Sequence, residues 1–228
     1  MVSAVKTRML LLALLAYSTQ NQAAEQSSPQ VSAAPQLTGA PAPAGRYRLD
    51  KAHASLTFRV NHLGYSMYTA QFDSFDVTMD FDPADFNSAR VEATIDVSSL
   101  ALPQPPEGFH DKLMLPAWFD AGAYPTMSFT STRVEKTAPD SMRVSGDFTL
   151  RGQQRPVDME VRFNGGYPCF HPYDPNARIG FSAWGSLRRS DFGMSEGIPA
   201  EGSMMGVSDA VEFFIEAEFS GPPTPPVN

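Results

Sequence analysis

Hydrophobic and polar residues alternate with a period of two along most of the chain between residues 46 and 220. This alternation predicts strands that bury one face and leave the other in water, as in antiparallel sheets. A weaker run over residues 126–135 brings the predicted strands to eight. The hydrophobic faces of the seven clear runs consist of Leu56, Phe58, Val60 and His62; Phe75, Val77, Met79 and Phe81; Val91, Ala93, Ile95 and Val97; Met142, Val144, Gly146, Phe148 and Leu150; Val157, Met159, Val161 and Phe163; Ile179, Phe181, Ala183, Gly185 and Leu187; and Val211, Phe213, Ile215, Ala217 and Phe219.

One segment interrupts the alternation. Residues 106–119 contain Phe109 and Leu113, which are four positions apart and would share one face of a helix. Pro116 follows and favours a turn. The segment therefore predicts a short helix, with Phe109, Leu113, Trp118 and Phe119 able to cover one end of the sheet structure.

The pattern as a whole predicts an all-β domain, either a sandwich or a closed barrel. The inward-facing residues are mostly Phe, Met, Val and Ile. Such side chains can fill a small barrel, or they can line a cavity inside it. The residues taken alone favour a filled interior and leave a ligand cavity as the alternative.

The two ends of the chain have a different composition. Residues 1–24 carry Lys6 and Arg8 before the apolar run from Met9 to Tyr17, which predicts a signal peptide and export to a bacterial periplasm. Residues 25–45 are rich in Ala, Pro, Gln and Ser and predict a disordered linker. Residues 221–228 predict a flexible, Pro-rich tail. The working domain is therefore expected at 46–220, and no later segment is long and apolar enough to be a transmembrane helix.

Charge and cysteine content exclude some functions. The chain has 17 basic and 25 acidic residues and a formal net charge of −8. Nucleic-acid binding needs clustered Lys and Arg, so no nucleic-acid partner is expected. The single cysteine, Cys169, rules out a disulfide framework and a four-thiolate zinc site.

Four ordered blocks of residues carry a resemblance to a known family. The blocks are Tyr47–Asp50 with His53, Phe58, His62–Gly64 and Phe72; Phe109–Leu113 with Trp118–Asp120, Tyr124, Pro125 and Phe129–Thr132; Gly146–Gly152 with Pro156 and Val157; and Gly180, Phe181, Arg189–Met194 and Val207–Asp209. In these blocks the chain resembles the YceI-like, polyisoprenoid-binding family of exported bacterial proteins. The resemblance implies an extended antiparallel, lipocalin-like barrel of about eight strands with a short helix capping one end. It also implies a carrier of polyisoprenoid, quinone-tail or fatty-acyl chains, and it leaves a homodimer open.

With the resemblance included, a hollow barrel becomes the favoured interpretation. A chain held inside it would contact Phe58, Val60, His62, Phe75, Val77, Met79, Ile95, Phe109, Leu113, Trp118, Phe119, Phe129, Phe148, Met159, Val161, Phe181 and Phe213. We expect no catalytic residue, no metal ligand and no cofactor other than the bound long-chain lipid.

The alternatives rest on fewer residues. A filled barrel could instead bind a partner protein through the aromatic-rich segment 164–178, which contains Cys169 as a free thiol. The third alternative is a metal- or Ser-dependent enzyme. The string nearest to Gly-x-Ser-x-Gly places Ser182 inside a predicted strand rather than at a nucleophile elbow, and the spacing of the four histidines is not diagnostic of a metal site. His62 is predicted to be a hydrogen-bonded core histidine, and the Arg189–Asp191 segment to hold a corner of the structure.

Overall fold

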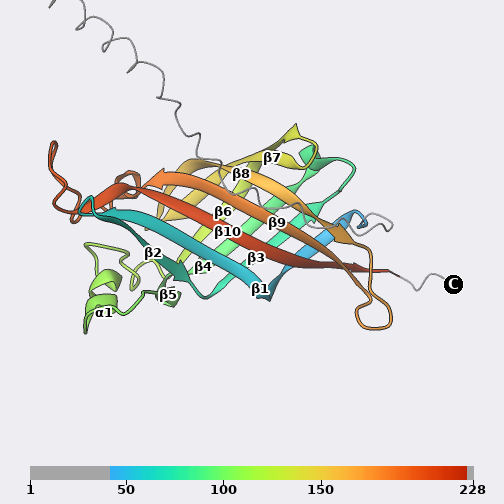
Figure 1. The fold of residues 1–228 in the computed structure, drawn as a ribbon, viewed down its shortest axis with the longest axis horizontal. Helices are drawn as coiled ribbons and strands as arrows, with labels where there is room; N and C mark the ends of the chain where they lie inside the picture. The colour runs from blue at the N-terminus through green and yellow to red at the C-terminus, as the bar shows by residue number, and fades with distance from the viewer. Residues whose placement is uncertain (1–41, 225–228) are drawn as a thin grey trace, which may run out of the picture. The chain divides into compact units, whose positions relative to one another are not determined.

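The computed structural model describes residues 42–224, which form an antiparallel barrel with one short helix (Figure 1). The helix α1 spans Phe109–Met114. Three 3₁₀ turns span Phe86–Ser88, Val97–Ser99 and Arg189–Phe192. The strands are β1 Gly45–His62, β2 Ser66–Phe72, β3 Phe75–Phe81, β4 Arg90–Asp96, β5 Leu100–Ala101, β6 Thr126–Ala138, β7 Ser141–Leu150, β8 Gln153–Tyr167, β9 Asn176–Arg188 and β10 Val207–Pro223.

Eight of these strands close the barrel. They pair in the order β1-β3-β4-β6-β7-β8-β9-β10, and β10 pairs with β1 to complete the circle. The predicted eight-stranded antiparallel barrel with a short helix is thereby confirmed. Strands β2 and β5 were not predicted; β2 pairs with β1 and β5 with β2, outside the closed circle. Closure leaves few unpaired strand edges, which stabilises an all-β chain against self-association.

Strand β1 has two differently paired halves. Residues 45–48 pair with β3, whereas residues 57–62 pair with β2 along the same edge. Between them the register with β10 shifts from Leu49↔Phe219 to Ala54↔Ala217, so residues 50–53 bulge out of the ladder. The bulge bends β1 and lets one long strand contribute to both the closed circle and the β2 extension.

The barrel interior is filled at the end away from α1. Phe81 lies 5.2 Å from Phe181 and 5.5 Å from Phe163, measured between ring centroids. Phe86 and Phe219 complete this aromatic plug at 5.4 Å from Phe81 and 5.9 Å from Phe181. Most of these pairs are tilted or edge-to-face, the arrangements that aromatic rings prefer. A filled interior is therefore present, but only at this end.

The ordered strands reach slightly beyond the span 46–220 expected from sequence. β1 begins at Gly45, β10 ends at Pro223, and Ala42 is buried. Thr224 is held as well, because its backbone N–H donates to the carbonyl of Pro175 at 2.8 Å. The predicted signal peptide and most of the predicted linker lie outside the described residues. Within residues 42–224 there is no helix with the length and hydropathy of a membrane span.

A charged cluster joins the β1 bulge to the β8–β9 loop at the plugged end. Arg178 on β9 donates to Asp50 in the bulge and, at 2.7 Å, to Asp174 in the loop. Hydrogen bonds from His53 and Arg178 hold the pKa of Asp50 below its ordinary value of 3.8. The backbone N–H of Asn176 and the Arg178 guanidinium do the same for the pKa of Asp174. Both carboxylates are therefore favoured in their charged form by folding.

Replacing Arg178 by methionine is expected to make folding stability less sensitive to acid. A carboxyl group whose pKa is lowered in the folded state contributes stability above its unfolded pKa, and this contribution is lost as the pH falls through the folded pKa. The wild type should therefore lose more unfolding free energy between pH 5 and pH 2 than Arg178→Met. Urea unfolding at several pH values measures this difference. Arg155→Met is the control, since Arg155 contacts no carboxylate within residues 42–224; equal acid sensitivity in all three proteins would contradict the prediction.

Candidate functional site

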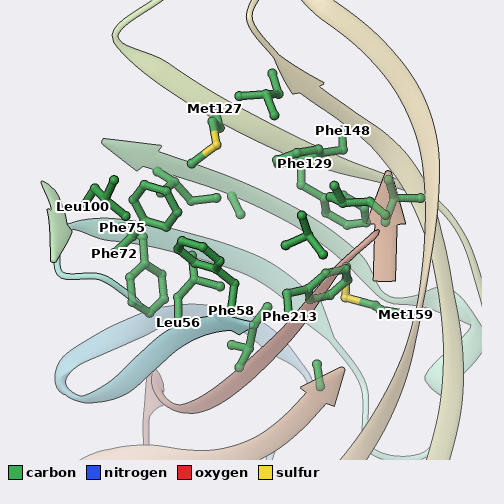
Figure 2. A pocket seen from close by; sticks show the side chains of 18 of the residues that line it. Leu56, Phe58, Phe72, Phe75, Leu100, Met127, Phe129, Phe148, Met159 and Phe213 are labelled. Atoms are coloured by element: carbon green, nitrogen blue, oxygen red, sulfur yellow. The ribbon is translucent and has the colours of Figure 1, made fainter. Parts of the chain in front are cut away.

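A cavity of about 600 Å³ occupies the barrel between the aromatic plug and α1. Its size falls within the ~300–1,000 Å³ typical of pockets for small organic ligands. Side chains from all ten strands and from the segment around α1 line it. Figure 2 shows phenylalanine rings, aliphatic groups and thioether chains converging on this space.

The alternating pattern accounts for the walls. Because successive side chains of a strand point to opposite faces, each strand sends every second residue inward. Phe58 on β1 lies directly opposite Phe213 on β10, and both line the cavity. Phe58 also stacks on Phe72 of β2, with ring centroids 5.6 Å apart. The wall is therefore continuous across the seam between β1 and its neighbours.

The structure brings all the predicted contact residues together. The cavity lining contains Phe58, Val60, His62, Phe75, Val77, Met79, Ile95, Phe109, Leu113, Trp118, Phe119, Phe129, Phe148, Met159, Val161, Phe181 and Phe213. That these side chains contact a ligand remains a prediction, because their position establishes only that they face the same space.

Several lining residues were missed from sequence. Phe72 and Leu100 come from β2 and β5, the two strands that the alternation did not predict (Figure 2). The signal was present, since Tyr68, Ala70 and Phe72 alternate with polar residues over a short run. Leu56 and Met127 also line the cavity, and both follow from the inward phase of their strands.

The cavity opens to solvent at the α1 end. Among its lining residues only His62 and Pro103–Pro106 are exposed, and they stand at the end of β1 and in the loop before α1. The interpretation of His62 as a core histidine is therefore wrong. The His62 side chain points to the inner face of β1, as predicted from the alternation. The strand ends at this residue, at the rim of the barrel, so the side chain is exposed to water instead of packed in the core.

Arg189 is the one charged residue in the described lining, and it is almost fully buried, with 4% of its surface exposed. Its guanidinium donates to the carbonyls of Ser208 at 2.9 Å, Val207 at 2.8 Å, Met194 at 3.1 Å and Glu196 at 2.7 Å. Burial lowers the pKa of Arg189, yet an arginine stays charged at neutral pH. The residue thus clamps the β9–β10 loop to the barrel rim.

The Arg189–Asp191 segment contacts partners outside itself. Asp191 forms no ion pair within residues 42–224, whereas Asp209 pairs with Arg188. Asp209 accepts from the Ser190 backbone N–H and hydroxyl and from Arg188, all at 2.8 Å. The Arg189 guanidinium lies over the Trp118 ring, 5.5 Å from its centroid. These contacts connect β9, β10 and the segment after α1 around the cavity mouth.

The polar groups of the lining gather at the mouth. His62, Tyr68, Gln104, Trp118 and Arg189 are the lining residues with nitrogen or oxygen in their side chains. Burial raises the pKa of Tyr68, and the Trp118 indole N–H is buried without a hydrogen-bond partner. The deep part of the cavity offers only hydrocarbon and thioether surface, so it suits an apolar chain, whereas the mouth can accommodate a polar end.

The residues considered for catalysis or metal binding lie outside the cavity. Ser182 is buried on the outer side of β9, where its hydroxyl donates to Glu216 at 2.6 Å and accepts from Asn164 at 3.0 Å. A second cluster, with metal-ligand spacing, joins Asp50, His53 and Glu218 at the β1 bulge. The Asp50 carboxylate already accepts hydrogen bonds from Ala52, His53 and Arg178, so this cluster is explained by folding.

Comparison with known proteins gives consistent matches over the barrel. The YceI-like domain profile matches residues 47–219. A UPF0312 protein of Vibrio cholerae serotype O1 is 34% identical over 170 residues, which cover 73% of this chain and 82% of the relative. The crystal structure of the Campylobacter jejuni YCEI protein matches with a TM-score of 0.59 and 28% identity, covering 76% of this chain and 96% of that one.

A third match extends the comparison to a more distant structure. A polyisoprenoid binding domain from Saccharophagus degradans, implicated in plant cell wall breakdown, has a TM-score of 0.55 and 15% identity. The match covers 77% of this chain and 98% of that domain. At this identity the similarity establishes a common fold.

Proposed function

The chain belongs to the family of YceI-like domains, and from this premise we propose that it is a non-catalytic lipid-binding protein that holds a long apolar chain inside its barrel. The observation that supports the proposal is the apolar cavity of about 600 Å³, whose exposed lining residues, within residues 42–224, lie at the α1 end. The polyisoprenoid-binding domain that shares the fold supports the same ligand class.

The proposed ligand is a polyisoprenoid, a quinone tail or a fatty-acyl chain, and no other cofactor is needed. Each methylene that leaves water for such a cavity contributes about 0.8 kcal/mol. Ten methylenes would therefore contribute about 8 kcal/mol, close to micromolar affinity before the cost of ordering the chain. Binding can thus rest on hydrophobic burial alone, with the polar end of the ligand placed at the mouth.

The proposal includes export to the periplasm, which rests on the signal-like residues 1–24. A homodimer is compatible with it, but the binding function requires only one barrel.

The alternative of a partner-binding module was tied to a filled barrel, so the cavity favours lipid binding over that alternative. The β8–β9 loop, which carries the exposed Phe170 and Tyr173, lies at the opposite end of the barrel from α1 (Figure 1) and plays no part in the proposed function.

Delipidated protein is expected to bind prenyl alcohols with an affinity that rises with chain length. The physical reason is that each added methylene buries more apolar surface until the cavity is full. Isothermal titration with geraniol, farnesol and geranylgeraniol, together with native mass spectrometry of the purified protein, measures this dependence. An affinity that does not depend on chain length, or protein that stays empty with every probe, would contradict the proposal.

A further inference from the structure

Two loops lie side by side at the cavity mouth. They are the β1–β2 turn, residues 63–65, and the β9–β10 loop, residues 193–206. The backbone N–H of Leu63 donates to the carbonyl of Gly206 at 2.9 Å. The Met204 side chain lies over Gly64, where its terminal methyl occupies the position that a Cβ would take. Figure 1 shows both loops at the same end of the barrel as α1.

These loops and the start of β2 expose hydrophobic side chains that would normally be buried. Tyr65 is 84% exposed, Met205 74%, Met204 63% and Met67 42%. We refer to these four residues as the mouth patch. The patch adjoins the cavity mouth, because His62 and Val207, which pair across β1 and β10 and flank the patch in sequence, both belong to the cavity lining. Exposed apolar side chains therefore lie next to the opening of the barrel, and exposed apolar surface of this kind marks an interaction site.

The charge around the patch restricts the partner. Residues 61–67 contain no Lys, Arg, Asp or Glu, and residues 194–206 contain Glu196 and Glu201 but no basic residue. Proteins that recognise anionic lipid surfaces carry clusters of Lys and Arg. The mouth patch has the apolar component of a membrane-binding surface without this basic component, so it matches a neutral lipid surface.

From the position of the patch beside the mouth and its lack of basic residues, we propose that the mouth patch docks on a zwitterionic lipid bilayer, so that a ligand chain passes between bilayer and cavity without crossing water. This inference rests on the proposed lipid-binding function and adds the surface through which the ligand is exchanged. Tyrosine suits the boundary between headgroups and acyl chains, and methionine adapts to an irregular apolar surface. Direct passage avoids water, where each exposed methylene of the ligand lowers the equilibrium population of the transferred chain by a factor of about four.

The test uses the full barrel and phosphatidylcholine vesicles. Tyr65→Ser combined with Met205→Ser removes the two most exposed side chains of the patch and leaves the cavity lining intact. Cosedimentation should show vesicle binding by the wild type and a reduction of at least tenfold in the double variant. Added phosphatidylglycerol should not strengthen wild-type binding. Stronger binding to the anionic vesicles, or unchanged binding by the variant, would overturn the proposal.

The β8–β9 loop supplies a matched control. Phe170 and Tyr173 are 61% and 81% exposed and stack on one another at the plugged end. The variant Phe170→Ser with Tyr173→Ser removes similar apolar surface but should keep wild-type vesicle binding. If this control loses binding as strongly as the mouth variant, docking through the mouth is refuted.

Two further measurements separate docking from ligand binding. Farnesol added from aqueous solution should bind the mouth variant as it binds the wild type, while transfer of farnesol from vesicles to the variant slows at least tenfold. Wild type that binds farnesol but not vesicles would refute docking and leave the proposed function standing. Failure to bind farnesol would refute the proposed function instead.

Sedimentation velocity completes the test. If the wild type forms a dimer that the mouth variant abolishes, and if it does not bind vesicles, the occupant of the mouth patch is a second copy of the chain and docking on a bilayer is refuted.

Discussion

Replacing Arg189 by methionine is expected to lower the free energy of unfolding by about 3–5 kcal/mol, because the substitution leaves four carbonyl groups without their donor. A buried acceptor that loses its partner costs about 1–3 kcal/mol, less whatever water or a local rearrangement restores. Methionine retains much of the apolar volume, so the loss reports on the hydrogen bonds. Equilibrium unfolding in urea measures it.

Arg188→Met is the control for this substitution. Arg188 precedes Arg189 in the chain, but its side chain is exposed and, among residues 42–224, forms an ion pair only with Asp209. Exposed ion pairs contribute about 0–1 kcal/mol, so this variant should stay within that range of the wild type. Similar losses for the two variants would show that Arg189 is not the clamp that the geometry indicates.

The substitution Arg189→Met should also loosen the backbone at the mouth of the cavity. The four carbonyls belong to residues 194, 196, 207 and 208, which span the β9–β10 loop from its start to the first residues of β10. Releasing them should free the loop that carries Met204 and Met205. Hydrogen exchange over residues 193–206 is therefore expected to accelerate in Arg189→Met while the strands of the aromatic plug keep their protection. Uniform acceleration across the barrel would instead indicate global loss of structure.

The strands could be predicted from sequence because their inward phase is a local property. The alternation that places Phe58, Met79 or Val161 on an inner face depends on backbone geometry alone, and all three line the cavity. The strand β2 was not predicted because its run of alternating apolar and polar residues is short and lies next to a turn. The helix was predicted from the spacing of Phe109 and Leu113, and both side chains do share the face that lines the cavity.

Whether the barrel is hollow could not be predicted in this way. Phe163 and Phe213 have the same inward phase, yet Phe163 packs against Phe81, Phe86 and Phe181 in the plug whereas Phe213 borders open space. The difference depends on the distance across the barrel, which is set by strand tilt and by the β1 bulge. The contacts of Arg189 could not be predicted from local sequence either, because its partners Val207 and Ser208 lie 18 and 19 residues further along the chain.

Filling the cavity should abolish tight ligand binding without unfolding the barrel. Ala93 on β4 and Ala183 on β9 both line the cavity with side chains that leave room for a larger group. Replacing both by phenylalanine would displace roughly four methylenes of a bound chain, which corresponds to about 3 kcal/mol. The affinity for geranylgeraniol is therefore expected to fall by roughly a hundredfold, as measured by isothermal titration.

The same double variant should keep or slightly raise its melting temperature, because apolar side chains that enter a void gain contacts instead of losing them. This combination separates a ligand cavity from a packing defect, since ligand affinity and fold stability then change in opposite directions. Ala138→Phe with Ala210→Phe is the control, because both alanines are exposed outside the cavity. It should bind geranylgeraniol as the wild type does. If the filled barrel binds the longest chains with undiminished affinity, the ligand does not occupy the interior, and the walls built by the alternating strands serve stability alone.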